Sequence, residues 1–588
     1  MFEARPIDTS VFAEARSRGL DPVMARIIAG RITRKESLDS ILNPQLKNVA
    51  PPSILKDIKK ATDRLRLAIS DGENIGVLTD YDADGLTSHA VITHALNRFG
   101  VSEKHISHWI GHRLEDGYGI SENLVDRLLG SEDIPDVVIT ADCGSSDESQ
   151  IARLKNAGID VVVTDHHRVS DDGPPQSAYA VVNPNRTDCL YPDKAIAGCL
   201  VSWLVMSQLR QELVDHGVLH GSVSKLGDLL DYVALGTVAD CVSLGVSETN
   251  RAVVKVGLSL IARQERPCWQ VAISHLVSSP WEINAELLAF KLAPRLNARG
   301  RIGHSLRAFE YLSASSVAEA TDAFIDLDAD NRKRRKIEKM MLDQAKPLAR
   351  RQRLHGGLVL CVVLENGHPG VQGIVASRIV EKEGVPAIIF TLGNVPGTLT
   401  GSMRSIPSID AKALLDRVND NIPQALVRYG GHTGACGMTI PQDSLVEFSR
   451  ELQVVYRQIY PKIAPKTRFL VDGELLIEQL NIGWIEYMES LGPFGRGFDR
   501  PSFIGIFQVV SVRVFGKELK HLSLRLRSEG QEIQAVWFSV LESTESAPVK
   551  PGDWLKCIYD LSINTYRDQE VSLTIRHGEL EQKGNLNV

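Results

Sequence analysis

Long apolar runs and paired cysteines are both missing from this sequence. No stretch reaches the roughly 18 consecutive apolar residues that a membrane-spanning helix needs, and the first residues carry charges instead of the apolar run of a secretory signal. The eight cysteines form no Cys-x-x-Cys pair, a pattern typical of neither a zinc site nor a disulfide framework. We therefore expect a cytoplasmic chain with reduced thiols and no membrane partner.

An excess of positive charge is missing as well. The chain has 66 Lys and Arg against 73 Asp and Glu, a net charge of −7, which excludes a histone-like protein that coats polyanions by bulk charge. A basic patch can still exist on an acidic protein, and residues 331–355 contain one, with ten Lys or Arg against two acidic residues. We interpret this helical segment either as a track for a nucleic-acid strand or as a solvated helix.

Repeated apolar runs predict the fold of the first half of the chain. They occupy residues 75–79, 136–140, 160–164 and 178–182. Helical stretches separate these runs, an alternation typical of a parallel sheet covered on both faces. The expected fold class is therefore α/β, with a doubly wound parallel-sheet domain. Residues 358–364 and 387–390 predict strands of a second, smaller α/β domain, which a long helix joins to the first.

Short segments of alternating polarity dominate the end of the sequence. They lie at 508–515, 522–527, 532–538, 554–559 and 571–575 and predict a C-terminal β-barrel of the OB type. Because 588 residues exceed what one core supports, we expect several domains. The predicted parts are a helical segment at 1–50, the first α/β domain at 51–265, a helical connector at 266–355, the second α/β domain at 356–465 and the barrel at 466–588.

Acidic residues follow three strands of the first predicted sheet. Residues 80–85 read Asp-Tyr-Asp-Ala-Asp-Gly after the first strand, Asp142 follows the second, and Asp165-His166-His167 follows the third. The carboxyl ends of neighbouring parallel strands meet at one crevice, where these carboxylates would repel each other unless cations are bound. Asp240 ends an apolar helical run, at a position where the helix dipole disfavours an anion, which is a mild indication of function.

The mixture of side chains indicates which metal is bound. Carboxylates with one or two imidazoles suit Mn²⁺ and tolerate Mg²⁺, whereas a site without thiols disfavours structural zinc. Several carboxylates able to bridge favour two divalent metal ions about 3.5–4 Å apart, an arrangement that activates water and stabilises an in-line displacement at phosphorus. The sequence therefore predicts a two-metal centre for phosphodiester chemistry.

These motifs resemble a known family. Residues 80–85, Ala141-Asp142-Cys143-Gly144, Thr164-Asp165-His166-His167 and Val238-Ala239-Asp240 are similar to the motifs of the DHH phosphoesterase superfamily. Within it, the chain resembles the RecJ single-strand-specific 5′→3′ DNA exonucleases. The supporting segments are 294–301 (PRLNARGR), 368–378 (HPGVQGIVASR), 401–405 (GSMRS), 429–432 (YGGH) and 493–497 (PFGRG).

The resemblance implies roles for individual residues. The implied metal ligands are Asp82, Asp84, Asp142, His166 and Asp240, while Asp80 is expected outside this set. The implied catalytic residues are Asp84, Asp142, His166, His167 and His432. The implied substrate-binding residues are Asn297, Arg301, Arg378, Ser402 and Arg404, among which Arg301, Ser402 and Arg404 would hold a 5′-terminal phosphate. An arginine presents a planar fork to phosphate oxygens, which suits that role.

The sequence also departs from the family pattern. Leu78 stands where other branches of the superfamily have a metal-binding His, and Gly367 stands where an aromatic residue is expected. Neither departure removes an expected ligand, although Leu78 leaves the metal affinity open.

Our leading hypothesis is a single-stranded-DNA-specific 5′→3′ exonuclease that releases nucleoside 5′-monophosphates by two-metal-ion hydrolysis, in DNA recombination and repair. We expect a monomer that acts on a single strand with a 5′ end, with a single-strand-binding protein or a helicase as partner. Two alternatives stay open: a DHH phosphodiesterase acting on short RNA or cyclic dinucleotides, and a non-catalytic replication scaffold of the same fold. The long basic connector and the barrel argue against a small substrate, and the complete ligand set argues against a scaffold.

Overall fold

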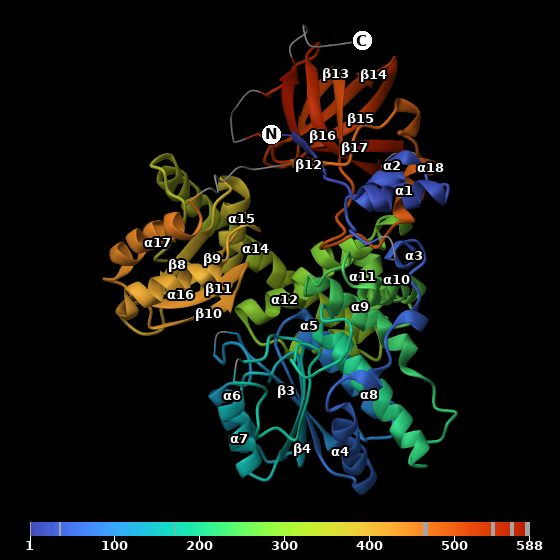
Figure 1. Cartoon of the computed structure of the whole chain (residues 1–588), viewed down its shortest axis with the longest axis vertical. Coiled ribbons are helices and arrows are strands. Elements are labelled where there is room, and N and C mark those ends of the chain that lie inside the picture. Colours follow the sequence, from blue (N-terminus) through green and yellow to red (C-terminus); the bar gives the residue numbers. More distant parts are fainter. Residues whose placement is uncertain are drawn as a thin grey trace.

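The computed structural model describes residues 2–34, 37–113, 115–170, 172–461, 469–541, 547–564 and 570–581. It places a parallel sheet at one end of the molecule, a barrel at the other, and a second sheet to one side, with a group of helices between them (Figure 1). Within the described residues, no helix is both long enough and apolar enough to span a membrane.

The first sheet consists of five parallel strands in the order β3-β2-β4-β5-β6. The strands are β2 (Ile75–Thr79), β3 (Ile106–Ile110), β4 (Val137–Ala141), β5 (Asp160–Thr164) and β6 (Ala180–Val182). Helices α4 (Ile58–Asp71), α5 (Ala83–Arg98) and α8 (Gly198–Asp215) pack on one face. Helices α6 (Glu122–Leu129) and α7 (Glu148–Asn156) cover the other. The predicted doubly wound α/β class is confirmed, but strand β3 was not predicted.

A group of helices extends the first domain. Its members are α9 (Leu230–Ala239), α10 (Glu248–Arg263), α11 (Pro267–Leu276), the π-helix η7 (Leu287–Leu292), α12 (Ala293–Ile302) and α13 (Leu306–Ser313). The 38-residue helix α14 (Val317–Leu354) packs against α11, α12 and α13 and then against the second domain. Its N-terminal half buries Phe324 and Leu327 in the main core, and the basic segment forms its C-terminal half.

The second sheet is mixed and follows the order β10-β11-β9-β8-β7. Its strands are β7 (Leu360–Val363), β8 (Ala387–Leu392), β9 (Thr398–Arg404), β10 (Arg428–His432) and β11 (Ala435–Pro441). Helix α15 (Gln372–Glu383) and the end of α14 pack on one face, and α16 (Ala411–Asn421) and α17 (Leu445–Ile459) pack on the other. This block is the predicted smaller α/β domain at the end of a long helix.

The C-terminal strands close into a barrel, as predicted. They are β13 (Phe503–Phe515), β14 (His521–Ser528), β15 (Gln531–Trp537), β16 (Trp554–Asn564) and β17 (Glu570–Glu581). Of the adjacent aromatic residues at the end of β15, Trp537 is buried and Phe538 is exposed. The alternation of a strand therefore places only one of the two rings in the barrel core.

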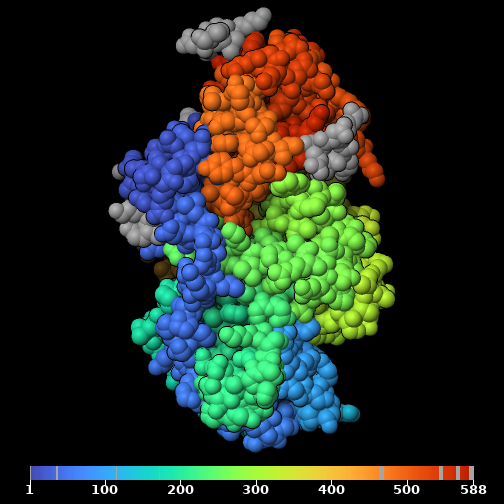
Figure 2. All heavy atoms as spheres, turned by 90° about the vertical axis from the view of Figure 1, so that its right-hand side faces the viewer, coloured from blue at the N-terminus to red at the C-terminus, as the bar shows by residue number. Residues whose placement is uncertain are grey.

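The beginning of the chain is joined to the barrel region. Strand β1 (Phe2–Ala4) pairs in parallel with β12 (Phe469–Val471), and Arg31 donates two hydrogen bonds of 2.6 and 2.8 Å to the Asp472 carboxylate. Helices α1 (Thr9–Ser17), α2 (Pro22–Ala29) and α3 (Leu38–Leu42) follow. Figure 2 shows this N-terminal segment running along the surface from the barrel end toward the parallel sheet.

Candidate active site

The carboxyl end of the parallel sheet gathers the acidic motifs. Asp80 follows β2, Asp142 follows β4 and Asp165 follows β5, all at the same edge of the sheet. Asp82 begins α5 as its N-cap residue, and Asp240 ends α9. The topology therefore brings residues from four separate parts of the sequence to one crevice.

His166 lies at the centre of this cluster. Its Nε2 atom is 3.2 Å from Asp142 Oδ1, 3.6 Å from Asp240 Oδ2 and 3.8 Å from Asp84 Oδ2. Three overlapping groups have ligand atoms close enough to share an ion: Asp142 with His166 and His167, Asp84 with His166 and Asp240, and Asp80 with Asp82 and Asp142. The five expected ligands are thus all present in the cluster, and Asp80, expected outside the ligand set, contributes to one group.

Two atoms at the centre of the cluster fit a metal-binding role. Asp142 Oδ1 and His166 Nε2 are buried, and neither has a hydrogen-bond partner among the described residues. Asp142 also adopts φ +60°, in the left-handed region that non-glycine residues rarely occupy. Buried polar atoms without partners are costly. A divalent cation bound between these two atoms would satisfy both, so the donor set fits Mn²⁺ or Mg²⁺.

Burial and mutual repulsion dominate the electrostatics of the carboxylates. Burial, together with neighbouring carboxylates, raises the pKa of Asp142 and of Asp80 well above the usual range. The same two causes raise the pKa of Asp240 to about 8, with Asp84 as the main neighbour. Such shifts mark groups that do not ionise together without a compensating positive charge.

Asp165 has a different role from the other acidic residues. Its Oδ1 accepts hydrogen bonds from His167 Nδ1 at 2.8 Å and from the backbone N–H of His166 at 2.7 Å, and its Oδ2 accepts from the backbone of Ser145 at 3.0 Å. Burial alone would lower the pKa of His167, but the Asp165 carboxylate raises it to about 9. Asp165 therefore orients the histidine pair and keeps His167 positively charged at neutral pH.

The N-terminus of α8 anchors Asp84. The backbone N–H of Gly198 donates to Asp84 Oδ2 at 2.7 Å, and that of Cys199 donates to Oδ1 at 3.0 Å. These free N–H groups and the helix dipole favour a carboxylate at this end. A Cβ on Gly198 would lie 2.9 Å from Asp142 Oδ1. Sequence reasoning missed these two positions, because the N-cap residue Ala197 has no capping side chain to mark the start of the helix.

Arginines from both domains face this crevice. On β9, Ser402 and Arg404 lie two residues apart on one face, and Arg404 Nη1 donates to Ser402 Oγ at 3.0 Å. Both side chains border the N-terminus of α15, because a Cβ on Gly373 would lie 2.6 Å from Arg404 Nη2. From α12, Arg301 Nη1 donates to the carbonyl of Gly370 at 3.0 Å. The three residues expected to hold a phosphate therefore border the junction of the two domains.

The guanidinium groups are close enough to repel one another. Burial lowers the pKa of Arg301 to about 9, and the charges of Arg113, Arg334 and Arg404 add to this effect. Arg334 pairs with Glu338, but no carboxylate pairs with Arg113, Arg301 or Arg404 within the described parts of the chain. We call these four residues the arginine cluster. Arg113 and Arg334 were not predicted to belong to such a group, and three of its four members have no carboxylate partner among the described residues.

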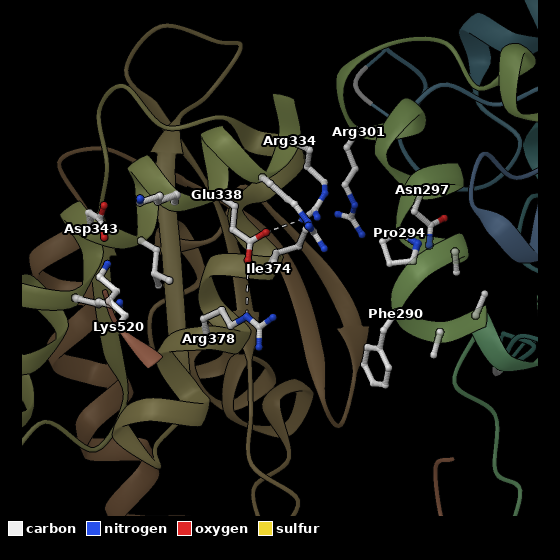
Figure 3. Close-up of a pocket in the computed structure, with 17 residues that line it drawn as sticks. Phe290, Pro294, Asn297, Arg301, Arg334, Glu338, Asp343, Ile374, Arg378 and Lys520 are labelled. Carbon is white, nitrogen blue, oxygen red and sulfur yellow. Dashed lines mark hydrogen bonds and ion pairs between the residues drawn. The ribbon is translucent and has the colours of Figure 1, made fainter. Parts of the chain in front are cut away.

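A cavity of about 680 Å³ extends from the arginine cluster toward the barrel. In Figure 3, Arg301, Asn297, Pro294 and Phe290 form one wall, and Arg334, Glu338, Ile374 and Arg378 form the opposite wall. Lys520, next to β14, lines the barrel end. The basic half of α14 thus lines a cavity between the domains.

The remaining predicted residues lie around these features. Asn297 Oδ1 accepts from the backbone N–H of Ala83 at 2.8 Å, which ties α12 to the start of α5. Arg378 lines the cavity and pairs with Glu381 at 3.0 Å. His432 is exposed at the end of β10, and its pKa is lowered by partial burial and by the charges of His167 and Arg168. His432, in the second domain, is thus near enough to His167 for their charges to interact.

The structure gives a reason for one departure from the family pattern. A Cβ on Gly367 would lie 2.5 Å from Thr391 Cγ2 and 3.1 Å from Met341 Cε, so a larger side chain has no space there. Leu78 is fully buried in a core cluster of the parallel sheet. Tyr118 is 54% exposed, and its ring lies edge to face with that of His167, with 5.1 Å between the ring centroids.

Comparisons with known proteins agree with this architecture. Family models match the DHH family N-terminal domain at residues 74–237, the DHHA1 domain at 356–457 and the RecJ OB domain at 471–577. The single-stranded-DNA-specific exonuclease RecJ of Dickeya dadantii is 32% identical over 91% of this chain and 92% of its own length. RecJ of Escherichia coli is 32% identical over 93% of this chain and 94% of its own length.

Solved structures show the same likeness. RecJ from Thermus thermophilus in complex with Mn²⁺ has a TM-score of 0.78 and 25% identity, and the match covers 99% of this chain and 79% of that one. An exonuclease RecJ bound to manganese has a TM-score of 0.56 and 29% identity, with 70% of this chain and 96% of that one covered. This protein therefore belongs to the RecJ family of DHH phosphoesterases.

Proposed function

We propose that this protein is a metal-dependent exonuclease that digests single-stranded DNA from its 5′ end and releases nucleoside 5′-monophosphates, in DNA recombination and repair. One observation carries the proposal: a carboxylate cluster suited to divalent cations adjoins an arginine cluster in which Arg113, Arg301 and Arg404 have no carboxylate partner among the described residues. Arg113 links the two, because its charge acts on Asp80 and on Arg301. A DNA strand with a terminal phosphate would supply the missing anion beside the metal centre.

The carboxylates and His166 hold the reaction centre in this proposal. Asp82, Asp84, Asp142, His166 and Asp240 would bind two divalent ions, which activate water and stabilise charge on the reacting phosphate. His167, kept charged by Asp165, can donate a hydrogen bond to a phosphate oxygen. His432 faces the same space from the second domain, where it can stabilise charge on the phosphate or protonate the leaving group.

The arginine cluster accounts for the direction of digestion. Arg301, Ser402 and Arg404 would hold the terminal phosphate at a fixed distance from the metals, and the N-terminus of α15 adds free backbone N–H groups. Because a 3′ end carries no such phosphate, only the 5′ end satisfies the pocket. Asn297 holds α12 against Ala83, which lies between the expected metal ligands Asp82 and Asp84. Arg378 lies further along the cavity.

The cellular context is part of the proposal. Both clusters are built from a single chain, which supports a monomer as the active form. An enzyme restricted to single strands needs its substrate unwound or kept unpaired, so we propose a helicase or a single-strand-binding protein as partner. We also propose that the protein acts in the cytoplasm, in keeping with a DNA substrate.

Digestion of end-labelled DNA tests the proposal. Single-stranded DNA labelled at the 5′ or the 3′ end is incubated with the protein and Mn²⁺, beside duplex DNA and a cyclic dinucleotide. We expect early release of the 5′ label as a mononucleotide, with duplex and dinucleotide untouched. Early release of the 3′ label would refute the polarity, and turnover of the dinucleotide alone would favour the small-substrate alternative.

A further inference from the structure

Phe290 is an unusually exposed aromatic residue in the middle of the molecule. It lies in the π-helix η7, whose residues Leu287, Leu288 and Leu292 are buried, while 71% of Phe290 is exposed. Placing such a large apolar surface in water is unfavourable, and short π-helical segments often occur at functional sites. The local geometry therefore turns three leucines into the core and one aromatic ring outward.

The ring projects into the cation-lined cavity. Figure 3 shows Phe290 on the same wall as Pro294 and Asn297, facing the wall that carries Ile374 and Arg378. Small side chains, Ala289 and Ala293, lie beside it on its own wall. The surroundings thus combine an apolar platform with an opposite cationic wall.

The residues at the two ends of the cavity show where the Phe290 ring lies along it. One end reaches Ala239, the neighbour of Asp240 in the metal-ligand cluster, and Asn297 and Arg301 line the same region. The other end reaches Lys346 of α14 and Lys520 of the barrel. A strand that leaves the metal centre toward the barrel would therefore pass Phe290.

We propose that Phe290 is a stacking platform that holds one nucleobase of the DNA strand on the 3′ side of the cleaved bond. A phenyl ring can stack on any base, whereas cations opposite it contact the backbone, and this combination binds single strands without sequence preference. The ring offers no hydrogen bond, so it selects an unpaired base without reading its identity. This inference rests on the proposed exonuclease function and adds a positioning residue to it.

An abasic-site scan tests the inference. The substrates are 5′-phosphorylated single strands about 20 nucleotides long, longer than the ~4–16 nucleotides that a single-strand-binding fold covers. Each carries one abasic nucleotide at a different distance from the 5′ end. The KM for digestion is compared among the wild type, Phe290→Ala, Phe290→Leu and Phe290→Trp. Leu354→Ala, a substitution in α14, is the matched control because Leu354 is also 71% exposed.

In the wild type, we expect the KM to rise at one abasic position by about 5- to 150-fold, the range of a single base–aromatic stack. Phe290→Ala and Phe290→Leu raise the KM on intact DNA by a similar factor and lose the penalty at that position, with kcat unchanged. Phe290→Trp retains both wild-type properties, and Leu354→Ala changes neither.

Two results would overturn the stacking role: an unchanged KM in Phe290→Ala, or the same abasic penalty in Phe290→Ala as in the wild type. Recovery by Phe290→Leu would also contradict it, because leucine keeps apolar volume without an aromatic face. Failure of the wild type to digest intact DNA would instead refute the proposed exonuclease function.

Discussion

The carboxylate cluster and the arginine cluster both bring like charges close together, but different parts of the molecule build them. The carboxylates sit at strand and helix ends of one domain, where the strained backbone of Asp142 and the N-terminus of α8 fix their positions. The arginines come from the loop after β3, from α12, from α14 and from β9. The first cluster is thus fixed within one domain, whereas the second exists only when two domains meet.

This difference indicates which kind of ligand each cluster is suited to bind. A rigid group of buried carboxylates suits small cations that demand defined coordination. A cluster assembled across a domain junction can adjust to a flexible polymer, and each guanidinium can rotate toward a phosphate oxygen. The metal centre should therefore respond to single substitutions by losing turnover, and the arginine cluster by losing preference for the substrate end.

The largest effect is expected at the metal centre. Asp142→Asn removes a charged oxygen that faces His166, and digestion of single-stranded DNA should fall about a thousandfold because metal activation of water is lost. The metal-free variant should unfold at a higher temperature than the metal-free wild type, since one repelling carboxylate is gone. Asp133→Asn, at an exposed position, is the control, and equal turnover in both variants would contradict the proposed site.

The arginine cluster should show a smaller, end-specific effect. Arg404→Ala should lower kcat/KM on 5′-phosphorylated DNA by about 10- to 100-fold, the worth of a hydrogen bond between charged groups. Activity on 5′-hydroxyl DNA should change little, so the ratio of the two substrates is the measurement. Arg417→Ala on α16 provides an exposed arginine control. If both substrates suffer equally, Arg404 does not read the terminal phosphate.

The pH dependence of stability should report on the carboxylate cluster and not on the arginine cluster. The folded-state pKa of Asp240 is about 8 against 3.8 for a free side chain, so the folded protein retains a proton that the unfolded chain has lost. His167 also has a raised pKa, about 9 against 6.5, and the stability it contributes below pH 6.5 is lost as the pH passes 9. Both trends make the metal-free protein less stable as pH rises.

Melting curves of the metal-free protein measure this trend. We expect the unfolding temperature to fall by roughly 5 °C between about pH 6 and about pH 9. Saturating Mn²⁺ should restore most of the loss at the higher pH, because it compensates the ionised carboxylates. A pH-independent unfolding temperature in the absence of metal would show that repulsion within the cluster is weak.

The smallest effect is expected at Asn297, which ties α12 to the start of α5. Asn297→Ala removes the acceptor for the Ala83 N–H at the start of α5, which should cost about 1 kcal/mol in the free energy of unfolding. Denaturant titration measures this loss, and Asn297→Asp, which keeps the acceptor oxygen, should largely avoid it. A large rise in KM without a change in stability would instead indicate direct contact with DNA.

Much of the fold and part of the candidate site could be predicted from sequence. Continuous apolar runs predict parallel strands, and parallel strands bring Asp80, Asp142 and Asp165 to one edge. Strand β3 was not predicted because its sequence, Ile-Ser-His-Trp-Ile, mixes polar and apolar residues at the sheet edge. The role of Asp165 in orienting the histidine pair was not predicted because it depends on hydrogen-bond geometry and not on residue type.

The arginine cluster was harder to predict for a physical reason. Its members Arg113 and Arg334 lie far apart in the sequence, and although Arg334 belongs to the basic segment 331–355, nothing in the sequence distinguishes it from the other Lys and Arg there. Only the packing of α12 and α14 between the two sheets brings them near Arg301. Long-range packing of this kind leaves no periodic signal in the sequence.

The pairing of β1 with β12 has a consequence for how the chain is assembled. Phe2 pairs with Phe469, so β1 finds its partner only after the long stretch of chain between them has emerged from the ribosome. Contacts this distant in sequence form slowly, because a long loop must close first. Strand β1 therefore joins the barrel region late in folding. Removing β1 should leave both α/β domains folded and lower the stability of the barrel end.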